Sequence, residues 1–347
     1  MRVLVLTNGW PTERHPEYAV FNARQVDSLR ALGLSVDVVF VNAREGGKVE
    51  YLRHLPKIAR LARPYDLVHC FHGLSFLLAR LGGVRAPLVV SFQNPLEREF
   101  AEMPRPLGTM AQALAARLLR RGGVGMIFKG AAPDFLAADP LLRRIPNGVD
   151  LDLFRPGDRA TARAALGIAP EAVVLLFVSS KNLHRPQKRH DRFLAVAAAL
   201  RVRRPDLAVV EAALVDEPME RVRLVYQAAD VHVMMSEFEG SPNSVKEALA
   251  SGLPVVSTDV GNVREMIDGL AAARVMPTFD AEAFAAAIEQ VLAAPPEARA
   301  ALRARIETGG LETMAVARRV MALYEDVLSV AAGRRAGADA SDRVASA

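Results

Sequence analysis

Two carboxylates, Glu239 and Glu247, flank a glycine-containing loop in the second half of the chain, with seven residues between them. Backbone N–H groups from Gly240 to Ser244, at the start of an expected helix, form an anion site that suits a phosphate. Because carboxylates repel phosphate, the expected partners of both glutamates are hydroxyl groups on either side of a diphosphate. This combination predicts binding of a nucleotide sugar. Taken singly, each glutamate fits equally well as a solvated surface charge.

A strand, a loop and a helix are expected to position these residues. The apolar run 231–235 follows Asp230 and precedes turn residues, as a buried parallel strand would. Ser241 is expected to cap the helix, with Pro242 as its first residue and Gly252 as its left-handed end. The loop then lies at the carboxyl end of a strand, where ligands bind in open parallel sheets.

A second polar group follows the apolar run 173–178, which is expected to be a parallel strand covered on both faces. Cations after such a strand can neutralise a diphosphate in the bound donor and as the leaving group gains charge. A solvated basic loop is the alternative. The cations of this loop are Lys181, His184, Arg185, Lys188 and Arg189.

These residues resemble a known family, the retaining glycosyltransferases of family 4, also called group 1. The matching residues are Glu239 and Glu247, the segments 240–243, 246–248 and 252–256, and Gly261 with Glu265. The resemblance implies an α/β protein of the GT-B fold, with two Rossmann-like parallel-sheet domains facing each other across a cleft. It also implies that Glu239 contacts the transferred sugar and that Glu247 holds the ribose.

The resemblance extends to the basic loop, where Lys188 matches the family's lysine, while Lys181 and Arg185 both stay candidates for its arginine. Glu239 and Lys188 are the expected catalytic residues. The full donor-binding set is Lys181, Arg185, Lys188, Glu239, Gly240, Ser241, Asn243, Ser244 and Glu247.

The acceptor side is expected in the first half of the chain. Its candidate residues are Phe21, Asn22, Arg24, His72 and Gln93. This side departs from the family pattern, because the usual glycine pair of the first loop is replaced by the segment 16–19. Many family members carry a histidine where Gln93 stands, and glutamine cannot exchange protons. The sequence therefore excludes a catalytic imidazole at this position.

The chain is long enough for two domains of ordinary size. We expect an acceptor-side Rossmann-like domain over residues 1–155 and a nucleotide-sugar domain over 156–310. A helix over 311–331 is expected to pack back on the first domain, and the small polar segment 332–347 to be disordered.

The positive charge of the chain is concentrated in its first half. Residues 1–156 hold 21 Lys and Arg against 14 Asp and Glu, whereas residues 157–347 hold 23 against 25. The segment 51–63 has a basic amphipathic pattern that suggests peripheral docking on an anionic membrane or on a lipid-linked acceptor; a solvated helix face is the alternative. No nucleic-acid motif accompanies the charge. A single cysteine and an opening without a signal peptide favour a cytoplasmic protein, which could sit on the inner face of the cell membrane.

No cofactor and no metal site are expected, since no Asp-x-Asp motif follows a strand. The donor is expected to be a UDP or GDP sugar, and the acceptor a saccharide or lipid-linked saccharide of polysaccharide or glycolipid biosynthesis. The resemblance implies that the anomeric configuration of the sugar is retained. Because the sequence offers no candidate carboxylate nucleophile for a double displacement, we expect a front-face substitution. Three alternatives stay open: a nucleotide-sugar-binding partner subunit without turnover, a sugar-nucleotide epimerase and a nicotinamide oxidoreductase. The last is the most remote, because the Gly-x-Gly-x-x-Gly motif of nicotinamide-binding proteins follows no strand in this sequence.

Overall fold

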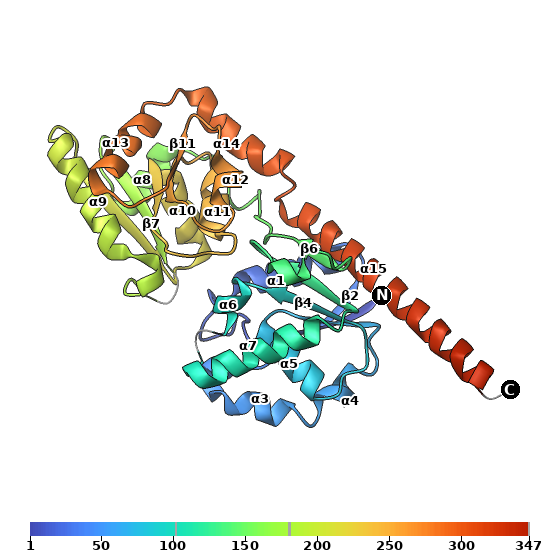
Figure 1. The fold of residues 1–347 in the computed structure, drawn as a ribbon. Coiled ribbons are helices and arrows are strands. Elements are labelled where there is room, and N and C mark those ends of the chain that lie inside the picture. The colour runs from blue at the N-terminus through green and yellow to red at the C-terminus, as the bar shows by residue number, and fades with distance from the viewer. Residues whose placement is uncertain (101–102, 180–181, 346–347) are drawn as a thin grey trace. The chain divides into compact units, whose positions relative to one another are not determined.

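The computed structural model describes residues 1–100, 103–179 and 182–345 (Figure 1). The chain divides into two compact units, each built around one parallel sheet. The first unit comprises Met1–Glu13, Tyr18–Pro146 and the chain from Met314, and the second comprises Arg14–Glu17 and Asn147–Thr313. The division falls between Pro146 and Asn147, ahead of the boundary expected after residue 155.

The sheet of the first unit has six described strands in the order β2-β1-β3-β4-β5-β6, and every neighbouring pair is parallel. The strands are β1 (Arg2–Thr7), β2 (Ser35–Phe40), β3 (Leu67–Cys70), β4 (Leu88–Phe92), β5 (Val124–Phe128) and β6 (Leu142–Arg144). The helices are α1 (Val20–Ala31), α2 (Ala43–Gly46), α3 (Val49–His54), α4 (Ile58–Ala62), α5 (Gly73–Leu81), α6 (Leu96–Glu99), α7 (Arg105–Leu119), the 3-10 turn η1 (Asp134–Leu136) and α15 (Thr313–Ala345).

The C-terminal helix α15 packs on one face of the first sheet (Figure 1). Its apolar residues Val320, Leu323 and Val327 share a core cluster with Val5 and Ile127 of the strands. Burial of this apolar stripe is what stabilises the helix on the sheet, since burying each such side chain is worth about 1.5–3 kcal/mol.

A buried polar contact fixes α15 to the same sheet. His69 of β3 lies 2.6 Å from the Tyr324 hydroxyl through Nδ1 and 2.8 Å from Ser91 Oγ through Nε2. Burial, aided by the positive charge of Lys129, holds the pKa of His69 well below its usual value. The imidazole is therefore a neutral structural link between β3, β4 and α15.

Helix α15 extends to Ala345, and the expectation of a disordered tail over residues 332–347 stays a prediction.

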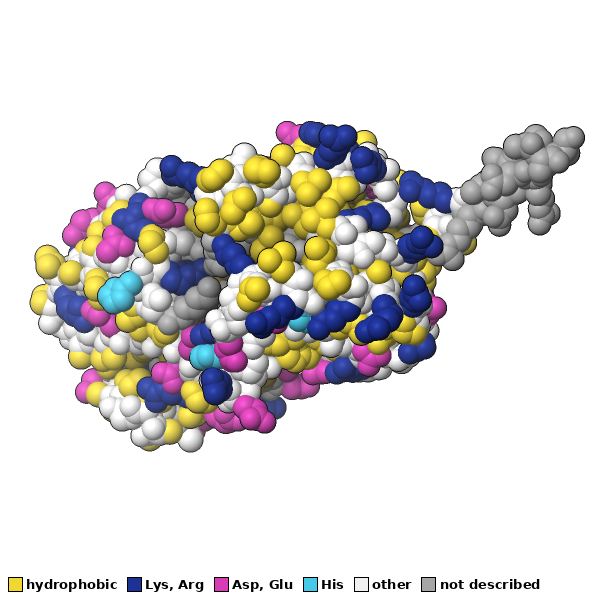
Figure 2. Space-filling view, turned by 90° about the horizontal axis from the view of Figure 1, so that it is seen from below, with side chains coloured by type: hydrophobic (Ala, Val, Ile, Leu, Met, Phe, Trp, Pro, Cys, Tyr) yellow, Lys and Arg dark blue, Asp and Glu magenta, His cyan; other side chains and the backbone are white. Residues whose placement is uncertain are grey.

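The segment 51–63 is broken into α3 and α4 rather than forming one basic amphipathic helix. Pro56 lies at the break, where its missing N–H removes a helical hydrogen bond. Leu52 and Leu61 are exposed beside the cations, whereas Ile58 is buried. On the face shown in Figure 2, Lys and Arg side chains are interspersed with hydrophobic ones. Across the described residues, no helix combines the length and apolarity needed to cross a bilayer.

The sheet of the second unit has five described strands in the order β11-β10-β9-β7-β8, again all parallel. The strands are β7 (Val173–Ser179), β8 (Val209–Val215), β9 (Val231–Met234), β10 (Val255–Thr258) and β11 (Ala273–Met276). The helices are α8 (Arg159–Leu166), the 3-10 turn η2 (Pro186–Lys188), α9 (His190–Arg203), α10 (Met219–Ala228), α11 (Asn243–Ala250), α12 (Val263–Ile267), α13 (Ala281–Leu292) and α14 (Pro296–Thr308).

Both faces of the second sheet are covered by apolar clusters. Alternate residues of β7 point to opposite faces, so that Leu176 joins the cluster with α10 and α11 while Phe177 joins the cluster with α9 and α13. Burial on both faces explains why this strand is a continuous apolar run. The two parallel-sheet, Rossmann-like units confirm the predicted α/β fold class.

Candidate functional site

The residues of the predicted donor site meet at the carboxyl ends of β7, β9 and β10, which are neighbours in the second sheet. The loop between β9 and α11 is held by two close contacts. Thr258 Oγ1 donates to the Ser236 carbonyl at 2.7 Å. Gly261 has φ +57°, and a Cβ atom built on it would lie 2.5 Å from the Gly240 carbonyl oxygen. Only glycine fits at position 261, for both conformation and space.

Glu239 and Lys188, the two expected catalytic residues, are in direct contact. Lys188 Nζ lies 2.7 Å from Glu239 Oε1, and Ser236 Oγ donates to the same oxygen at 2.9 Å. Each of the two charged side chains is 14% exposed. The pair is therefore shielded from bulk water yet reachable by a ligand. An ion pair in such a setting is stronger than a fully exposed one.

The basic loop around Lys188 is joined to the β9–α11 loop through Gln187. The side-chain amide of Gln187 donates to the Phe238 carbonyl at 2.7 Å, and the backbone carbonyl of Gln187 accepts from the Glu237 N–H at 2.9 Å. These bonds fix the position of Lys188 relative to Glu239. Sequence reasoning did not identify Gln187, because nothing local distinguishes it from other loop amides.

The other cations of this loop take separate partners. Arg189 forms ion pairs with Asp191 and Glu237, so its charge is compensated away from the Lys188 pair. Arg185 donates to the Gln187 side-chain oxygen at 3.0 Å. Lys181, the other candidate for the family's arginine, lies outside the described residues.

Glu247 accepts a hydrogen bond of 2.8 Å from the Tyr226 hydroxyl. Tyr226 is fully buried on α10, and burial followed by the negative charge of Glu247 raises the pKa of its hydroxyl well above the usual value. The phenol thus stays a donor and holds one carboxylate oxygen of Glu247 in place. The sequence gives no sign of this contact, since a tyrosine at helical spacing indicates only a core position.

Ser244, in the first turn of α11, is paired with a histidine of β9. The Ser244 hydroxyl lies 3.1 Å from His232 Nε2, and His232 Nδ1 lies 3.0 Å from the Leu176 carbonyl. Burial lowers the pKa of His232 to about 4, so the ring is neutral. Because a carbonyl only accepts, Nδ1 carries the hydrogen and Nε2 accepts from Ser244. His232 is a further site residue that sequence reasoning missed.

The helix N-terminus differs from the expected cap. Helix α11 begins at Asn243 with Pro242 in the capping position, and Ser241 makes no side-chain capping bond. Among the described residues, the buried Ser241 Oγ and Asn243 Oδ1 have no hydrogen-bond partner. Buried polar atoms normally have partners, so these two are free for a ligand at the helix N-terminus. Gly252 ends the helix at φ +67°, which confirms the predicted left-handed end.

Lys246 points away from this anion site. Its side chain is fully buried, and Nζ donates to the Asn147 carbonyl at 2.7 Å. Burial lowers the pKa of the amine to about 7, with a smaller opposing effect of Glu247. Lys246 therefore ties α11 to the segment that opens the second unit.

In the first unit, the side-chain amide of Asn22 contacts the loop after β1. Asn22 is buried, and its amide donates to the Gly9 carbonyl at 2.8 Å and lies 3.3 Å from Thr7 Oγ1. These bonds hold the loop after β1 against α1. Phe21 and Arg24 flank Asn22 on the same helix and are partly exposed.

His72 and Gln93 follow the neighbouring strands β3 and β4, so they lie at the same edge of the first sheet. His72 Nδ1 accepts from the Leu74 N–H at 3.1 Å, which places the ring hydrogen on Nε2, 3.5 Å from Glu99 Oε1. Glu99 is buried and accepts from the N–H groups of Gly73 at 3.0 Å and Asn94 at 3.1 Å. This carboxylate was missed from the sequence. Glu99 is the last residue of the short helix α6, and no local sequence pattern distinguishes it from a surface glutamate.

No group of three or more His, Cys, Asp or Glu side chains that could hold a metal ion occurs among the residues the structure describes. In the second unit, the arrangement offers instead a helix N-terminus, one shielded ion pair and one fixed carboxylate. Together these groups can bind a phosphate and the hydroxyl groups next to it.

The segment that contains the candidate donor site is similar to known glycosyltransferases. Residues 172–294 match the family model described as glycosyl transferases group 1, which confirms the resemblance recognised in the sequence. The chain is 35% identical over 198 residues to a D-inositol 3-phosphate glycosyltransferase of Saccharomonospora viridis, covering 48% of this chain and 45% of that protein. The chain thus spans about half the length of the curated relatives it matches.

Solved structures share the fold over almost the whole chain. Sucrose-phosphate synthase from Thermosynechococcus elongatus superimposes with a TM-score of 0.71 at 18% identity, over 95% of this chain and 100% of that one. Anabaena Alr3699/HepE, solved in complex with UDP and glucose, gives a TM-score of 0.68 at 17% identity, over 94% and 100%. Over residues 172–294 the chain is similar to the group 1 glycosyltransferases, and its fold is that of the two-domain GT-B glycosyltransferases.

Proposed function

We propose that the protein is a glycosyltransferase that moves a sugar from a nucleoside diphosphate, UDP or GDP, to a hydroxyl group with retention of configuration. The observation that carries the proposal is the shielded pair of Lys188 and Glu239 beside the N-terminus of α11. A cation and a helix N-terminus suit a diphosphate, while the neighbouring carboxylate suits the hydroxyl groups of a sugar. The family match over residues 172–294 supports the same reading.

In the proposed reaction the bond between the anomeric carbon and the diphosphate oxygen breaks, and a bond to the acceptor oxygen forms on the same face. The proton of the acceptor hydroxyl passes to the departing diphosphate oxygen, so no protein base is required. Lys188 has three N–H donors and can hold Glu239 and a diphosphate oxygen together. Its charge then stabilises the leaving group as negative charge develops there.

Glu239 orients the sugar in this scheme, and Glu247, fixed by Tyr226, holds the ribose hydroxyls. The unpartnered Ser241 Oγ and Asn243 Oδ1 provide further contacts at the helix N-terminus. The helix N-terminus and Lys188 supply the positive potential at the diphosphate.

The acceptor is proposed to be a saccharide or lipid-linked saccharide, as in polysaccharide or glycolipid synthesis, bound on the side of the first unit that carries His72 and Gln93. A cytoplasmic location with peripheral contact of the segment 51–63 to an anionic membrane belongs to the same proposal. Flotation with anionic liposomes tests this part, and binding that does not respond to salt or to anionic lipid contradicts it.

The function is tested first by identifying the donor. A thermal-shift panel of nucleoside diphosphates and their sugars should raise the melting temperature for one base, because a ligand that binds only the folded state stabilises it. Transfer or donor hydrolysis is then measured with that sugar, and the anomeric configuration of the product is read by NMR.

The variants Glu239→Gln and Lys188→Met should lower turnover by about two to three orders of magnitude. Glu237→Gln is the matched control. Glu237 is an exposed carboxylate of the β9–α11 loop that pairs with Arg189 and does not contact Lys188. Wild-type turnover in either site variant contradicts the assignment. Donor binding without any turnover in the wild type favours a partner subunit instead.

A further inference from the structure

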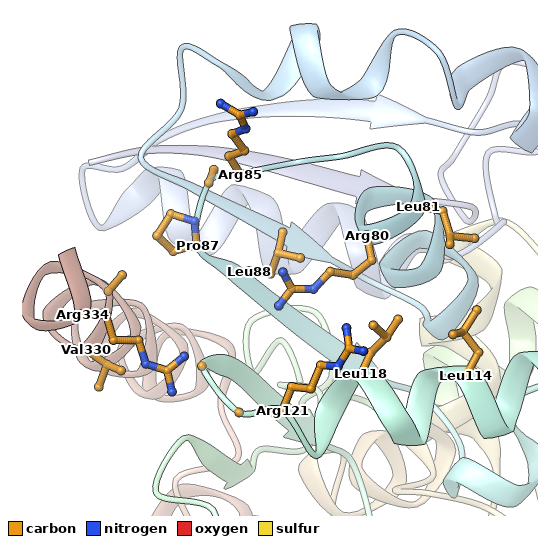
Figure 3. Close-up of a pocket in the computed structure, with 14 residues that line it drawn as sticks. Arg80, Leu81, Arg85, Pro87, Leu88, Leu114, Leu118, Arg121, Val330 and Arg334 are labelled. Carbon is orange, nitrogen blue, oxygen red and sulfur yellow. The ribbon is translucent and has the colours of Figure 1, made fainter. Parts of the chain in front are cut away.

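The first unit has a basic pocket at the amino ends of its strands, whereas His72 and Gln93 lie at the carboxyl ends. It lies between the ends of α5 and α7, the segment that enters β4, and helix α15, and its volume is about 610 Å³ (Figure 3). Leu88, the first residue of β4, and Gly123, just before β5, are part of its wall. The pocket is therefore at the amino ends of the strands, away from the proposed acceptor side.

Four arginines line this pocket, and no acidic residue does. They come from four separate segments: Arg80 from α5, Arg85 from the loop before β4, Arg121 from the turn after α7, and Arg334 from α15. Figure 3 shows the guanidinium groups of Arg80 and Arg121 extending into the space between their helices, with Arg334 approaching from α15 and Arg85 extending away. We call these four residues and their surroundings the arginine pocket.

Within the part of the chain that the structure describes, none of the four arginines forms a hydrogen bond or an ion pair with another residue. Arg80 is partly buried, and its Nε atom is buried without a hydrogen-bond partner. Burial, together with the positive charge of Arg121, lowers the pKa of Arg80. A buried donor without a partner costs about 1–3 kcal/mol, and more when charged.

The second unit shows how this chain satisfies a buried guanidinium when no ligand is required. Arg163 is fully buried and donates to the Ala228, Pro170 and Ala172 carbonyls, at 3.0, 2.6 and 2.8 Å, and to Asp230 at 2.6 Å. Arg80 has no such set of acceptors. The unmet Nε donor of Arg80 contrasts with the paired guanidinium group of the buried Arg163, and this contrast points to an acceptor supplied by a ligand.

Helix dipoles do not balance the charge of the pocket. Arg80 and Arg121 lie at the carboxyl ends of α5 and α7, where each helix contributes about half a negative charge. Two helix ends therefore offset about one of four positive charges. Arg85 is on a loop and Arg334 is inside α15, so neither benefits from a helix end.

One wall of the pocket is apolar. Leu81 is 62% exposed, and Leu114 and Leu118 of α7 line the same side. An exposed leucine beside partly buried ones offers a surface for the hydrocarbon part of a ligand, at about 25 cal/mol per Å² of apolar surface covered. Charge and apolar wall together describe a ligand with an anionic head and an apolar body.

We propose that the arginine pocket binds the phosphate monoester group of an amphiphile, held by Arg80, Arg121 and Arg334, with its apolar part against Leu81, Leu114 and Leu118. Arginine is suited to this task because its planar fork of donors matches phosphate oxygens in pairs. The site is separate from the donor site in the second unit. Its existence does not depend on the proposed transfer reaction.

Isothermal titration of the full chain tests the site with three probes: inorganic phosphate, glycerol 3-phosphate and monomeric dihexanoyl phosphatidic acid. We expect saturable binding of the last, at least about tenfold tighter than inorganic phosphate. Tighter binding of the short-chain lipid than of glycerol 3-phosphate supports a lipid source, whereas equal binding of all three probes overturns the role of the leucine wall. No binding of any probe overturns the site.

Arg121→Gln and Arg334→Gln should each weaken binding by about tenfold or more, as loss of a charge-assisted hydrogen bond does. Arg117→Gln is the matched control, since this exposed arginine of α7 lies outside the pocket. Equal losses in the control and in the pocket variants would mean unspecific surface charge and overturn the proposal. Both pocket residues are near the surface, so the variants should fold, which the thermal unfolding of each variant verifies.

Discussion

The buried amine of Lys246 predicts an unusual rise of stability with pH. Its pKa is about 7 in the folded protein, against 10.5 for an unburied lysine. Between these values the unfolded state binds a proton that the folded state does not, so the free energy of unfolding increases with pH by about 1.4 kcal/mol per pH unit. Below about pH 7 both states bind the proton, and the full penalty of at most about 5 kcal/mol is present.

Replacing Lys246 by methionine, which is unbranched and of similar length, removes this titration. Urea unfolding of the wild type and of Lys246→Met, followed by far-ultraviolet circular dichroism, should diverge with pH. Between about pH 7.5 and pH 9.5 the wild type should gain about 2–3 kcal/mol relative to the variant. Other groups that titrate in this range, such as the cysteine and the tyrosines, cancel in the comparison.

Two controls belong to this experiment. The exposed Lys57→Met should leave the pH dependence of the wild type unchanged. The only tryptophan, Trp10, is in the first unit, so its fluorescence separates the unfolding of that unit from the effect of Lys246 in the second. Parallel pH profiles for the wild type and Lys246→Met would refute the reasoning, because the amine would then be charged and solvated in the folded state.

Further predictions concern the contacts around the two sites. Gly261→Ala should destabilise the second unit by about 2 kcal/mol or more and weaken donor binding. The new Cβ atom would lie 2.5 Å from the Gly240 carbonyl oxygen, and the backbone at this position has a positive φ that alanine rarely adopts. An unchanged midpoint of urea unfolding would contradict this prediction. Tyr226→Phe removes the hydrogen bond from the phenol to Glu247 and leaves the fold intact. The dissociation constant of the nucleotide, measured by calorimetry, should rise about threefold to tenfold. An unaltered dissociation constant would contradict a positioning role for Tyr226. Glu99→Gln keeps one acceptor for two backbone N–H groups and should cost about 1–3 kcal/mol in thermal unfolding, whereas the exposed Glu97→Gln should cost nothing.

The separation between the two proposed sites has a practical consequence. The donor site uses the carboxyl ends of the second sheet, and the arginine pocket uses the amino ends of the first. Each can therefore be changed without touching residues of the other. Failure of the arginine pocket to bind phosphate esters would leave the transfer reaction intact as a proposal, and the reverse also holds.

Local patterns in the amino-acid sequence were enough to predict the elements around the donor site. The apolar run that forms β9, the loop after it and the left-handed end of α11 at Gly252 follow from hydrophobic pattern and turn chemistry, which act over a few residues. The position of Glu239 and Glu247 on that loop and helix followed in the same way. The cap was the exception, because Ser241 and Pro242 each satisfied a local rule and only the backbone path decided between them.

Which distant residues come into contact depends on how the strands and helices pack. Lys188 contacts Glu239 across 51 residues because β7 and β9 are neighbours in the sheet, and strand order is not encoded in any local pattern. Tyr226 and His232 contact Glu247 and Ser244 because α11 packs beside α10 and against β9. The arginine pocket joins segments from Arg80 to Arg334, whose side chains share one concavity only after α15 has packed on the first sheet. Local chemistry thus fixed which groups are available, and the packing of sheets and helices fixed which of them act together.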